Sequence, residues 1–385
     1  MKIKVLLIVF FLLIISSVKI VAQNPPKKVS PEKISDIPHK TLWEKWMWGH
    51  RSAVFVLIKE RPINYDTAYI KSYYKRLVLT LPVSTRFLQF SLIDVKTGNR
   101  LTFVPNLQYN LGISVSSRWV SFILNSGVKL FNGNTATKGK TEYKDLQLNI
   151  YGRKFTTDMY FQYYKGFFIR NSRSYDNYIS DSSYSIRSDV KALHMGASTY
   201  YILNHKKFSY GSVFSFVEQQ KKSAGSLLLG IYYSYLEAKG NPSLVNYPFS
   251  TSFDTLSLIR TGNTHHFGLN LGYIYTWVFF KKFCVTASLA QGIGAEQVFY
   301  TRNNNSRYYK LNGGAGKLHG RLALRYGNGR YFIGGMGMFD YFLFSGKSNS
   351  TFNYSYGKIM VYIGYRFSVL KKEKKLLRKL SLIDY

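Results

Sequence analysis

Cysteine, acidic residues and long apolar runs are all scarce in this chain of 385 residues. The single cysteine, Cys284, has no partner for an internal disulfide, and cysteine clusters that hold zinc or iron–sulfur groups are excluded. Beyond residue 22, no run of about 18 apolar residues occurs, so no transmembrane helix is predicted there. No stretch rich in proline, glycine and serine divides the chain into separate domains.

The 19 acidic residues are too dispersed to form a metal site. Calcium sites need several oxygen ligands close together, and the aspartates do not have that spacing. They include Asp66, Asp94, Asp145, Asp158, Asp176, Asp181 and Asp189. The sequence therefore predicts neither a bound metal nor a cofactor.

The first 22 residues have the layout of a secretory signal peptide. Lys2 and Lys4 precede an apolar core from Val5 to Ile15, and Ala22 is a small residue at the expected cleavage point. A segment of this kind is too short and wrongly flanked for a membrane-spanning helix. The sequence therefore predicts export, with the mature chain beginning at residue 23.

Apolar and polar residues alternate over stretches of about ten residues in this chain, longer than the roughly five or six of an ordinary soluble strand. Between Leu107 and Ser116, one face is aliphatic or aromatic and the other carries Gln, Asn, Gly and Ser. A tilted strand that crosses a membrane needs about 9–11 residues. Because backbone groups in hydrocarbon must all be paired, such strands must close on one another.

The sequence therefore predicts an all-β fold, a transmembrane antiparallel up-and-down β-barrel of about 12 strands within a range of 10–14. The aromatic content of 17% suits the girdles of such a barrel. The barrel is expected over 76–369, after a periplasmic or interfacial N-terminal segment at 23–75 and before a basic C-terminal tail at 370–385. Candidate strands lie near 76–83, 86–93, 106–117, 119–130, 145–155, 157–169, 190–203, 208–218, 225–236, 264–279, 283–298, 317–327, 330–343 and 357–369.

Short and long connections alternate along most of the chain, as expected when short turns face the periplasm and long loops face outward. Long polar loops are expected at 131–144, 170–189, 237–263, 299–316 and 344–356. The alternation fails between 190 and 236, where two consecutive connections are short. Either one strand is miscounted there, or the stretch 208–224 does not span the membrane.

The formal net charge of +34 indicates an anionic partner. Nucleic acid suits a basic chain, but an exported barrel has little access to it, so none is expected. Outer-membrane lipid with anionic headgroups is the expected partner, or else a surface glycan. The alternative is that the lysines of loops and turns are simply solvated.

The histidines offer little for catalysis. Neighbours on one strand face are already about 6.6 Å apart, so His194 and Ser198, four residues apart, are too distant to act as base and nucleophile. His265 and His266 point to opposite faces of a strand and cannot chelate one ion. No catalytic residue is predicted. A lipid-modifying enzyme stays an alternative, and it would need a nucleophile or carboxylate beside His194, His266 or His319.

Three arginines on the last strands are predicted to face the barrel lumen: Arg321, Arg325 and Arg366. The lumen of such a barrel is polar. Because acids are scarce, these arginines would favour anions there if they were free. The alternative is that they are paired or solvated.

One stretch resembles a known family. It comprises Gln220, Lys221, Lys222, Ser223, Ala224 and Gly225. With Asp66–Ile70 and Gly292–Gly294, it resembles the signature of a family of uncharacterised Bacteroidota outer-membrane barrel proteins, domain of unknown function 4421. The family pattern has Pro-Ala-Ala-Phe where this chain has Gly211–Phe214, a local departure. The resemblance implies the architecture and an outer-membrane location, and it carries over no catalytic residue.

The same stretch, 218–226, falls where the alternation of connections fails, so we expect a specialised inward turn or rim contact there. The predicted function is that of a non-enzymatic outer-membrane barrel with a structural role or narrow-pore transport. A barrel subunit of a secretion or surface-assembly complex is a further alternative beside the lipid-modifying enzyme.

Overall fold

The computed structural model describes residues 64–73, 76–106, 109–117, 120–131, 134–175, 183–302, 307–345 and 350–368. The predicted signal peptide, the predicted basic tail and residues 23–63 of the predicted N-terminal segment lie outside the described residues. Within the described ranges, no helix has the length and apolar character needed to cross a membrane.

Fifteen strands are formed in the described part of the chain. They are β1 (Ile70–Ser72), β2 (Arg76–Asp94), β3 (Arg100–Val104), β4 (Tyr109–Ser117), β5 (Val120–Phe131), β6 (Glu142–Tyr151), β7 (Phe155–Ile169), β8 (Ser185–Ile202), β9 (Glu218–Gln220), β10 (Ala224–Lys239), β11 (Ile259–Phe279), β12 (Phe283–Arg302), β13 (Arg307–Gly327), β14 (Tyr331–Ser345) and β15 (Ser350–Ser368). Helical turns are short: α3 (Thr135–Lys138), α4 (Gly211–Phe214), and the 3-10 turns η1 (Ser172–Ser174), η2 (Phe249–Ser252) and η3 (Thr255–Ser257).

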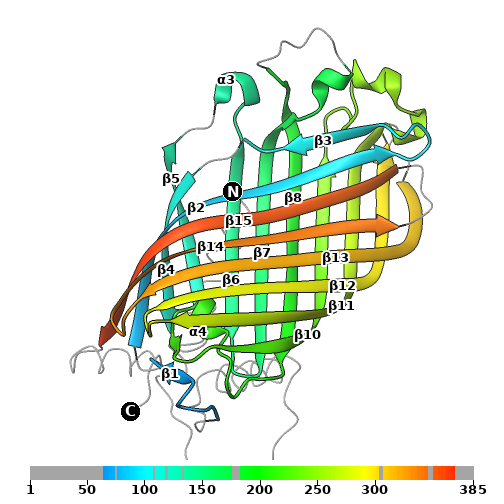
Figure 1. Ribbon diagram of the computed structural model, residues 1–385. Coiled ribbons are helices and arrows are strands. Elements are labelled where there is room, and N and C mark those ends of the chain that lie inside the picture. Colours follow the sequence, from blue (N-terminus) through cyan, green and yellow to red (C-terminus); the bar gives the residue numbers. More distant parts are fainter. Residues whose placement is uncertain are drawn as a thin grey trace, which may run out of the picture. The chain divides into compact units, whose positions relative to one another are not determined.

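Thirteen of these strands form one sheet that closes on itself (Figure 1). The outer circuit of pairings runs through 12 strands: β2, β4, β5, β6, β7, β8, β10, β11, β12, β13, β14 and β15, with β15 pairing back to β2. β3 bridges β2 and β7 directly. Where β3 replaces β4, β5 and β6, the circuit has ten strands. The predicted antiparallel barrel of about 12 strands is confirmed.

The two ends of the barrel differ in their connections. One end, here called the short-turn end, carries the connections 152–154, 280–282 and 328–330. The other, the long-loop end, carries 132–141, 170–184 and 240–258. At the β11–β12 turn, Phe280 and Lys281 adopt positive φ values of 50° and 62°, as tight hairpin turns require.

Alternation along the strands separates an apolar outer face from a buried inner face, which is polar over part of the barrel. On β11, Leu269 is 63% exposed on the outside, whereas Asn270 on the inside is 3% exposed. Tyr273, Tyr275 and Trp277 follow on the outer face toward the short-turn end. An apolar outer band, aromatic residues near its edge and a polar interior are the arrangement of an outer-membrane β-barrel.

Some predicted strand and loop boundaries were wrong. The predicted strands 76–83 and 86–93 are one continuous strand, β2, which runs through Ser84 and Thr85 because neither residue breaks the backbone pairing of a strand. The predicted long loops 299–316 and 344–356 are largely strand in β12 to β15. β13 alone has 21 residues, about twice what a tilted span needs, so polar strand residues continue beyond the apolar band.

Candidate functional site: a filled barrel interior

The connection between β8 and β10, residues 203–223, folds into the barrel at the short-turn end. Residues 208–217 of this inward segment are all buried, and they include α4. Figure 1 shows α4 at the end of the barrel where β1 lies. β9, within the same segment, pairs with β1 rather than with the barrel wall. The predicted strand 208–218 was therefore wrong. Short and long connections fail to alternate here because this stretch does not span the membrane.

Arg321, Arg325 and Arg366 lie inside the barrel, with exposures of 8%, 8% and 1%. Each donates a hydrogen bond to the inward segment. Arg321 reaches the hydroxyl of Tyr210. Arg325 Nη1 donates to the carbonyl of Ser212 at 3.1 Å, and Arg366 Nε donates to the carbonyl of Phe216 at 2.8 Å. Three arginines of the barrel wall, all distant in sequence from the inward segment, thus hold that segment in place.

Acidic residues pair with several of the interior cations. Arg321 Nη2 lies 2.6 Å from Asp158 Oδ2. Asp340, on β14, receives both Lys317 Nζ at 3.0 Å and His319 Nδ1 at 2.8 Å. Asp340 is fully buried, and Lys317 and His319 are each 3% exposed. Arg321 and Lys317 are therefore each compensated by a carboxylate and do not form a free positive lining.

His194 does have a serine partner, although it is not Ser198. His194 Nε2 lies 3.0 Å from Ser234 Oγ on β10, and His194 Nδ1 lies 3.0 Å from Gln162 Oε1 on β7. Tyr160 and Tyr354 donate to Ser234 Oγ at 3.0 and 2.9 Å. Ser198 instead accepts from Lys317 Nζ at 2.9 Å. The sequence analysis compared residues along one strand and therefore missed Ser234. Ser234 lies on β10, which pairs with β8, and it is two residues from Leu236, the register partner of His194.

The two adjacent histidines lie on opposite faces of β11. His266 is buried inside and contacts Glu296 Oε1 at 3.1 Å. His265 is on the outer face, where the hydroxyl of Tyr233 lies 2.9 Å from its Nδ1. Among the described residues, no group of three or more His, Cys, Asp or Glu is arranged to hold a metal ion.

A hydrophobic core fills the interior toward the long-loop end. Phe90 stacks on Phe103 of β3 with ring centroids 4.8 Å apart, and Phe342 stacks on Tyr354 at 4.5 Å. The loop between β10 and β11 adds further buried apolar side chains to the same cluster: Leu244, Val245, Phe249 and Phe253. Aromatic rings therefore occupy the space that an open pore would leave to water.

Polar contacts fix that loop over the long-loop end. Arg187 Nη1 donates to the carbonyl of Leu244 at 2.6 Å. Asp254 caps the N-terminus of η3, and its backbone N–H donates to Asp94 Oδ2 at 2.6 Å. The hydrogen bond from Lys96 to Asp254, helped by the backbone N–H of Leu256, lowers the pKa of the Asp254 carboxyl below its usual value.

Two small cavities lie inside the described part of the barrel. One of about 40 Å³ lies among β6, β7, β13 and β15, and another of about 10 Å³ lies beside Ser212 and Arg325. A single water molecule needs about 10–15 Å³ of such space. Neither cavity is large enough to be a channel.

The family-like motif forms the exit of the inward segment. Gln220 Oε1 accepts from the backbone N–H of Ser209 at 2.9 Å, and its amide donates to the carbonyl of Lys207 at 2.7 Å. Ser223 Oγ accepts from the backbone N–H of Val278 at 2.9 Å. Lys221 and Lys222 are exposed, while Ala224 and Gly225 begin β10. The motif thus closes the inward fold and returns the chain to the barrel wall.

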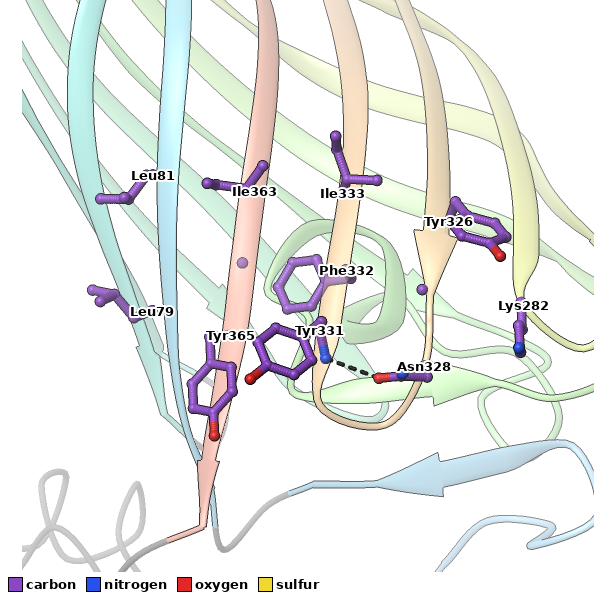
Figure 2. Close-up of a pocket in the computed structure, with 12 residues that line it drawn as sticks. Leu79, Leu81, Lys282, Tyr326, Asn328, Tyr331, Phe332, Ile333, Ile363 and Tyr365 are labelled. Atoms are coloured by element: carbon purple, nitrogen blue, oxygen red, sulfur yellow. Dashed lines mark hydrogen bonds between the residues drawn. The ribbon is translucent and has the colours of Figure 1, made fainter.

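The outer face carries a groove of about 610 Å³ at the short-turn end (Figure 2). Figure 2 shows Leu79 and Leu81 on one side, Ile333 and Ile363 above the tyrosines, and Lys282 at the opposite edge. The turn beneath is fixed by Asn328, whose Oδ1 accepts from the backbone N–H of Tyr331 at 2.9 Å. The groove combines an apolar wall with an exposed lysine.

Several solved outer-membrane proteins are similar to this chain at low identity. The Pseudomonas putida toluene transporter TodX is 10% identical, with a TM-score of 0.26, over 76% of this chain and 89% of TodX. The translocator domain of the autotransporter NalP from Neisseria meningitidis is 16% identical, with a TM-score of 0.31, over 84% and 96%. The outer membrane protein OmpT of Vibrio cholerae is 10% identical, with a TM-score of 0.24, over 80% and 100%.

No curated protein matches the sequence. A family model does match, and it covers residues 64–367, which includes the inward segment, the three arginines and nearly all of the closed sheet. The chain belongs to the family described as domain of unknown function 4421.

Proposed function

We propose that this protein is an outer-membrane barrel with a structural role, closed at rest, and that it is neither a constitutive pore nor an enzyme. The short-turn end faces the periplasm and the long-loop end faces outward, as in bacterial barrels generally. A leader at 1–22 would direct the chain to export. The observation that carries the proposal is the inward segment, held by Arg321, Arg325 and Arg366 beneath an aromatic core.

The serine–histidine contact also supports a structural role. Ser234 and His194 are both fully buried. Two tyrosine hydroxyls donate to Ser234 Oγ, so its own proton is directed to His194 Nε2, and His194 in turn donates from Nδ1 to Gln162. Every polar atom of the group has a partner. A nucleophile needs access to its substrate, and this serine has none.

The first prediction concerns conductance. The purified mature protein, reconstituted in a planar lipid bilayer, should show no steady current, because the interior cavities are far smaller than a water-filled channel. The measurement is single-channel recording, with insertion verified in parallel by heat-modifiable migration of the reconstituted protein. An open porin inserted by the same procedure is the positive control. A steady, anion-biased current would overturn the closed-barrel proposal and favour narrow-pore transport.

Anionic lipid is the partner that we propose for the short-turn end. The groove there offers an apolar wall for acyl chains, and Lys282 at its edge is exposed. Lys281 and Arg330 lie in the two adjacent turns and are exposed as well. Each basic residue near a membrane surface contributes about 1 kcal/mol of attraction to anionic lipid. A surface glycan, the other partner expected from the sequence, stays a prediction.

The second prediction tests this partner. The double variant Lys281→Glu/Lys282→Glu should bind phosphatidylglycerol about tenfold or more weakly, because two attractive charges become repulsive. Native mass spectrometry of the detergent-solubilised protein, titrated with phosphatidylglycerol or phosphatidylethanolamine, measures the effect. Lys191→Glu/Lys239→Glu is the matched control, because these paired exposed lysines lie at the long-loop end. Equal losses in both double variants would show general charge attraction and contradict a site at the groove.

A further inference from the structure

The interior cavity of about 40 Å³ is a chamber with both polar and apolar walls. Phe214 of the inward segment lines it, together with residues of β5 to β8 and β13 to β15. They are Ile123, Gln147, Asn149, Tyr151, Asp158, Met159, Tyr160, Ser198, His319, Arg321, Met336, Met338, Tyr356, Lys358 and Met360. Its space corresponds to a few water-sized particles, since one water needs about 10–15 Å³.

Lys358 is the exceptional residue of this chamber. It lies on β15 opposite Met338 and is 3% exposed. The other interior cations without a carboxylate, Arg325 and Arg366, donate to backbone carbonyls. Lys358 makes no ion pair or hydrogen bond with any residue in the described ranges. Because an unpaired buried ammonium group gives up its proton, Lys358 stays charged only if an anion lies beside it.

The acids near Lys358 are already occupied. The charges that act on Lys358 are Arg86 and Asp158. Asp158 Oδ2 receives Arg321 at 2.6 Å, and its Oδ1 accepts from the hydroxyl of Tyr151 at 2.7 Å. Arg86 is paired with Asp145. The surrounding charges therefore leave the positive charge of Lys358 unmatched.

Two further polar groups of the chamber, Gln147 and Ser198, can donate hydrogen bonds. Gln147 Oε1 accepts from Arg86 at 3.3 Å, so its amide nitrogen keeps its N–H groups. Ser198 Oγ accepts from Lys317 at 2.9 Å, so its hydroxyl proton is available. An ammonium group, an amide and a hydroxyl around a space of this size suit a small anion. A metal cation would be repelled by Lys358 and Arg321.

We propose that the chamber binds a small inorganic anion, chloride in the first instance, at Lys358 Nζ. The anion balances the charge of Lys358 beneath the inward segment. A lipid headgroup with its glycerol and acyl chains is too large for this space. The conductance recording tests the closed barrel and the bromide map tests the site at Lys358, so a failure of one is distinguishable from a failure of the other.

The direct test is to locate bromide, which replaces chloride and scatters anomalously. Crystals of the mature protein in detergent, grown with sodium bromide as the only halide, should give an anomalous peak within hydrogen-bonding reach of Lys358 Nζ. The peak should be absent in Lys358→Met, which keeps the length of the side chain without its charge. A wild-type map without a peak in the chamber would overturn the proposal. If Lys358→Met does not fold, the wild-type map decides alone.

The second test is the dependence of stability on the anion. Urea unfolding, rather than guanidinium chloride, is measured in sodium chloride and in sodium gluconate at equal ionic strength. At a chloride concentration of about ten times Kd, the folded-to-unfolded ratio of the wild type should rise about tenfold. Lys358→Met should lose this rise, and Lys144→Met, at an exposed lysine of β6, should retain it. The same chloride dependence in all three proteins would place the anion elsewhere and contradict the site.

Discussion

Arg321→Met is expected to destabilise the folded barrel by about 3–5 kcal/mol, the usual cost of removing one partner from a buried ion pair. Arg321 makes three interior contacts, to Asp158, Tyr210 and His319. Without the guanidinium group, the half-buried carboxylate of Asp158 keeps the hydroxyl of Tyr151 as its remaining partner. Urea unfolding of the reconstituted protein, followed by tryptophan fluorescence, measures the free energy of unfolding.

A double-mutant cycle separates the charge from the packing. Asp158→Asn alone also breaks the pair, but Arg321→Met/Asp158→Asn leaves no unpaired charge. The double variant should therefore be more stable than the sum of the two single losses predicts, by about 1–3 kcal/mol. Strictly additive losses would show that the two side chains do not interact, and they would contradict the ion pair between Arg321 and Asp158.

The barrel was predictable from sequence because its strands repeat a local signal. In β4, each residue from Tyr109 to Ser116 alternates between exposed and buried, as the sequence pattern indicates. That alternation depends only on neighbouring residues, because side chains of a strand point to opposite faces in turn. The closing of the sheet followed from the need to pair every backbone group in hydrocarbon.

The inward segment could not be predicted, because its local pattern imitates a strand. Phe208, Tyr210, Phe214 and Phe216 are spaced at even intervals, like the outer residues of a spanning strand. What turns this stretch inward is contact with residues about 110 to 150 positions later, such as Arg321 and Arg366. Only the interrupted alternation of connections indicated that something was different there.

The partners of the interior charges were equally hidden. Asp158 and Asp340 stand alone in the sequence, more than 150 residues from one another, and neither resembles a ligand motif. The fold brings Asp158 to Arg321 and Asp340 to Lys317 and His319. The arginines were found because they occupy inner positions of an alternating pattern. Whether they were free or paired depended on strand neighbours that only the sheet register defines.

Leu269→Arg is expected to cost about 2–4 kcal/mol of folding free energy, the cost of a basic residue on the lipid face of a barrel near the middle of the bilayer. Leu269 lies near the middle of β11, on the outer face, and is 63% exposed. Its strand neighbours at the same level, Ile231 and Ile293, are apolar and exposed too. Urea unfolding in lipid vesicles measures the loss of stability.

The matched control is Leu256→Arg, which places the same substitution on an exposed leucine of the loop η3. There the charge meets water, and the change should stay within about 0.5 kcal/mol, as for most surface substitutions. In a water-soluble protein, Leu269 would be a surface residue as well, and both substitutions would cost equally little. A large loss at Leu269 with none at Leu256 therefore identifies hydrocarbon, rather than water, as the medium around the outer face of β11, and equal small losses would refute the membrane-spanning barrel.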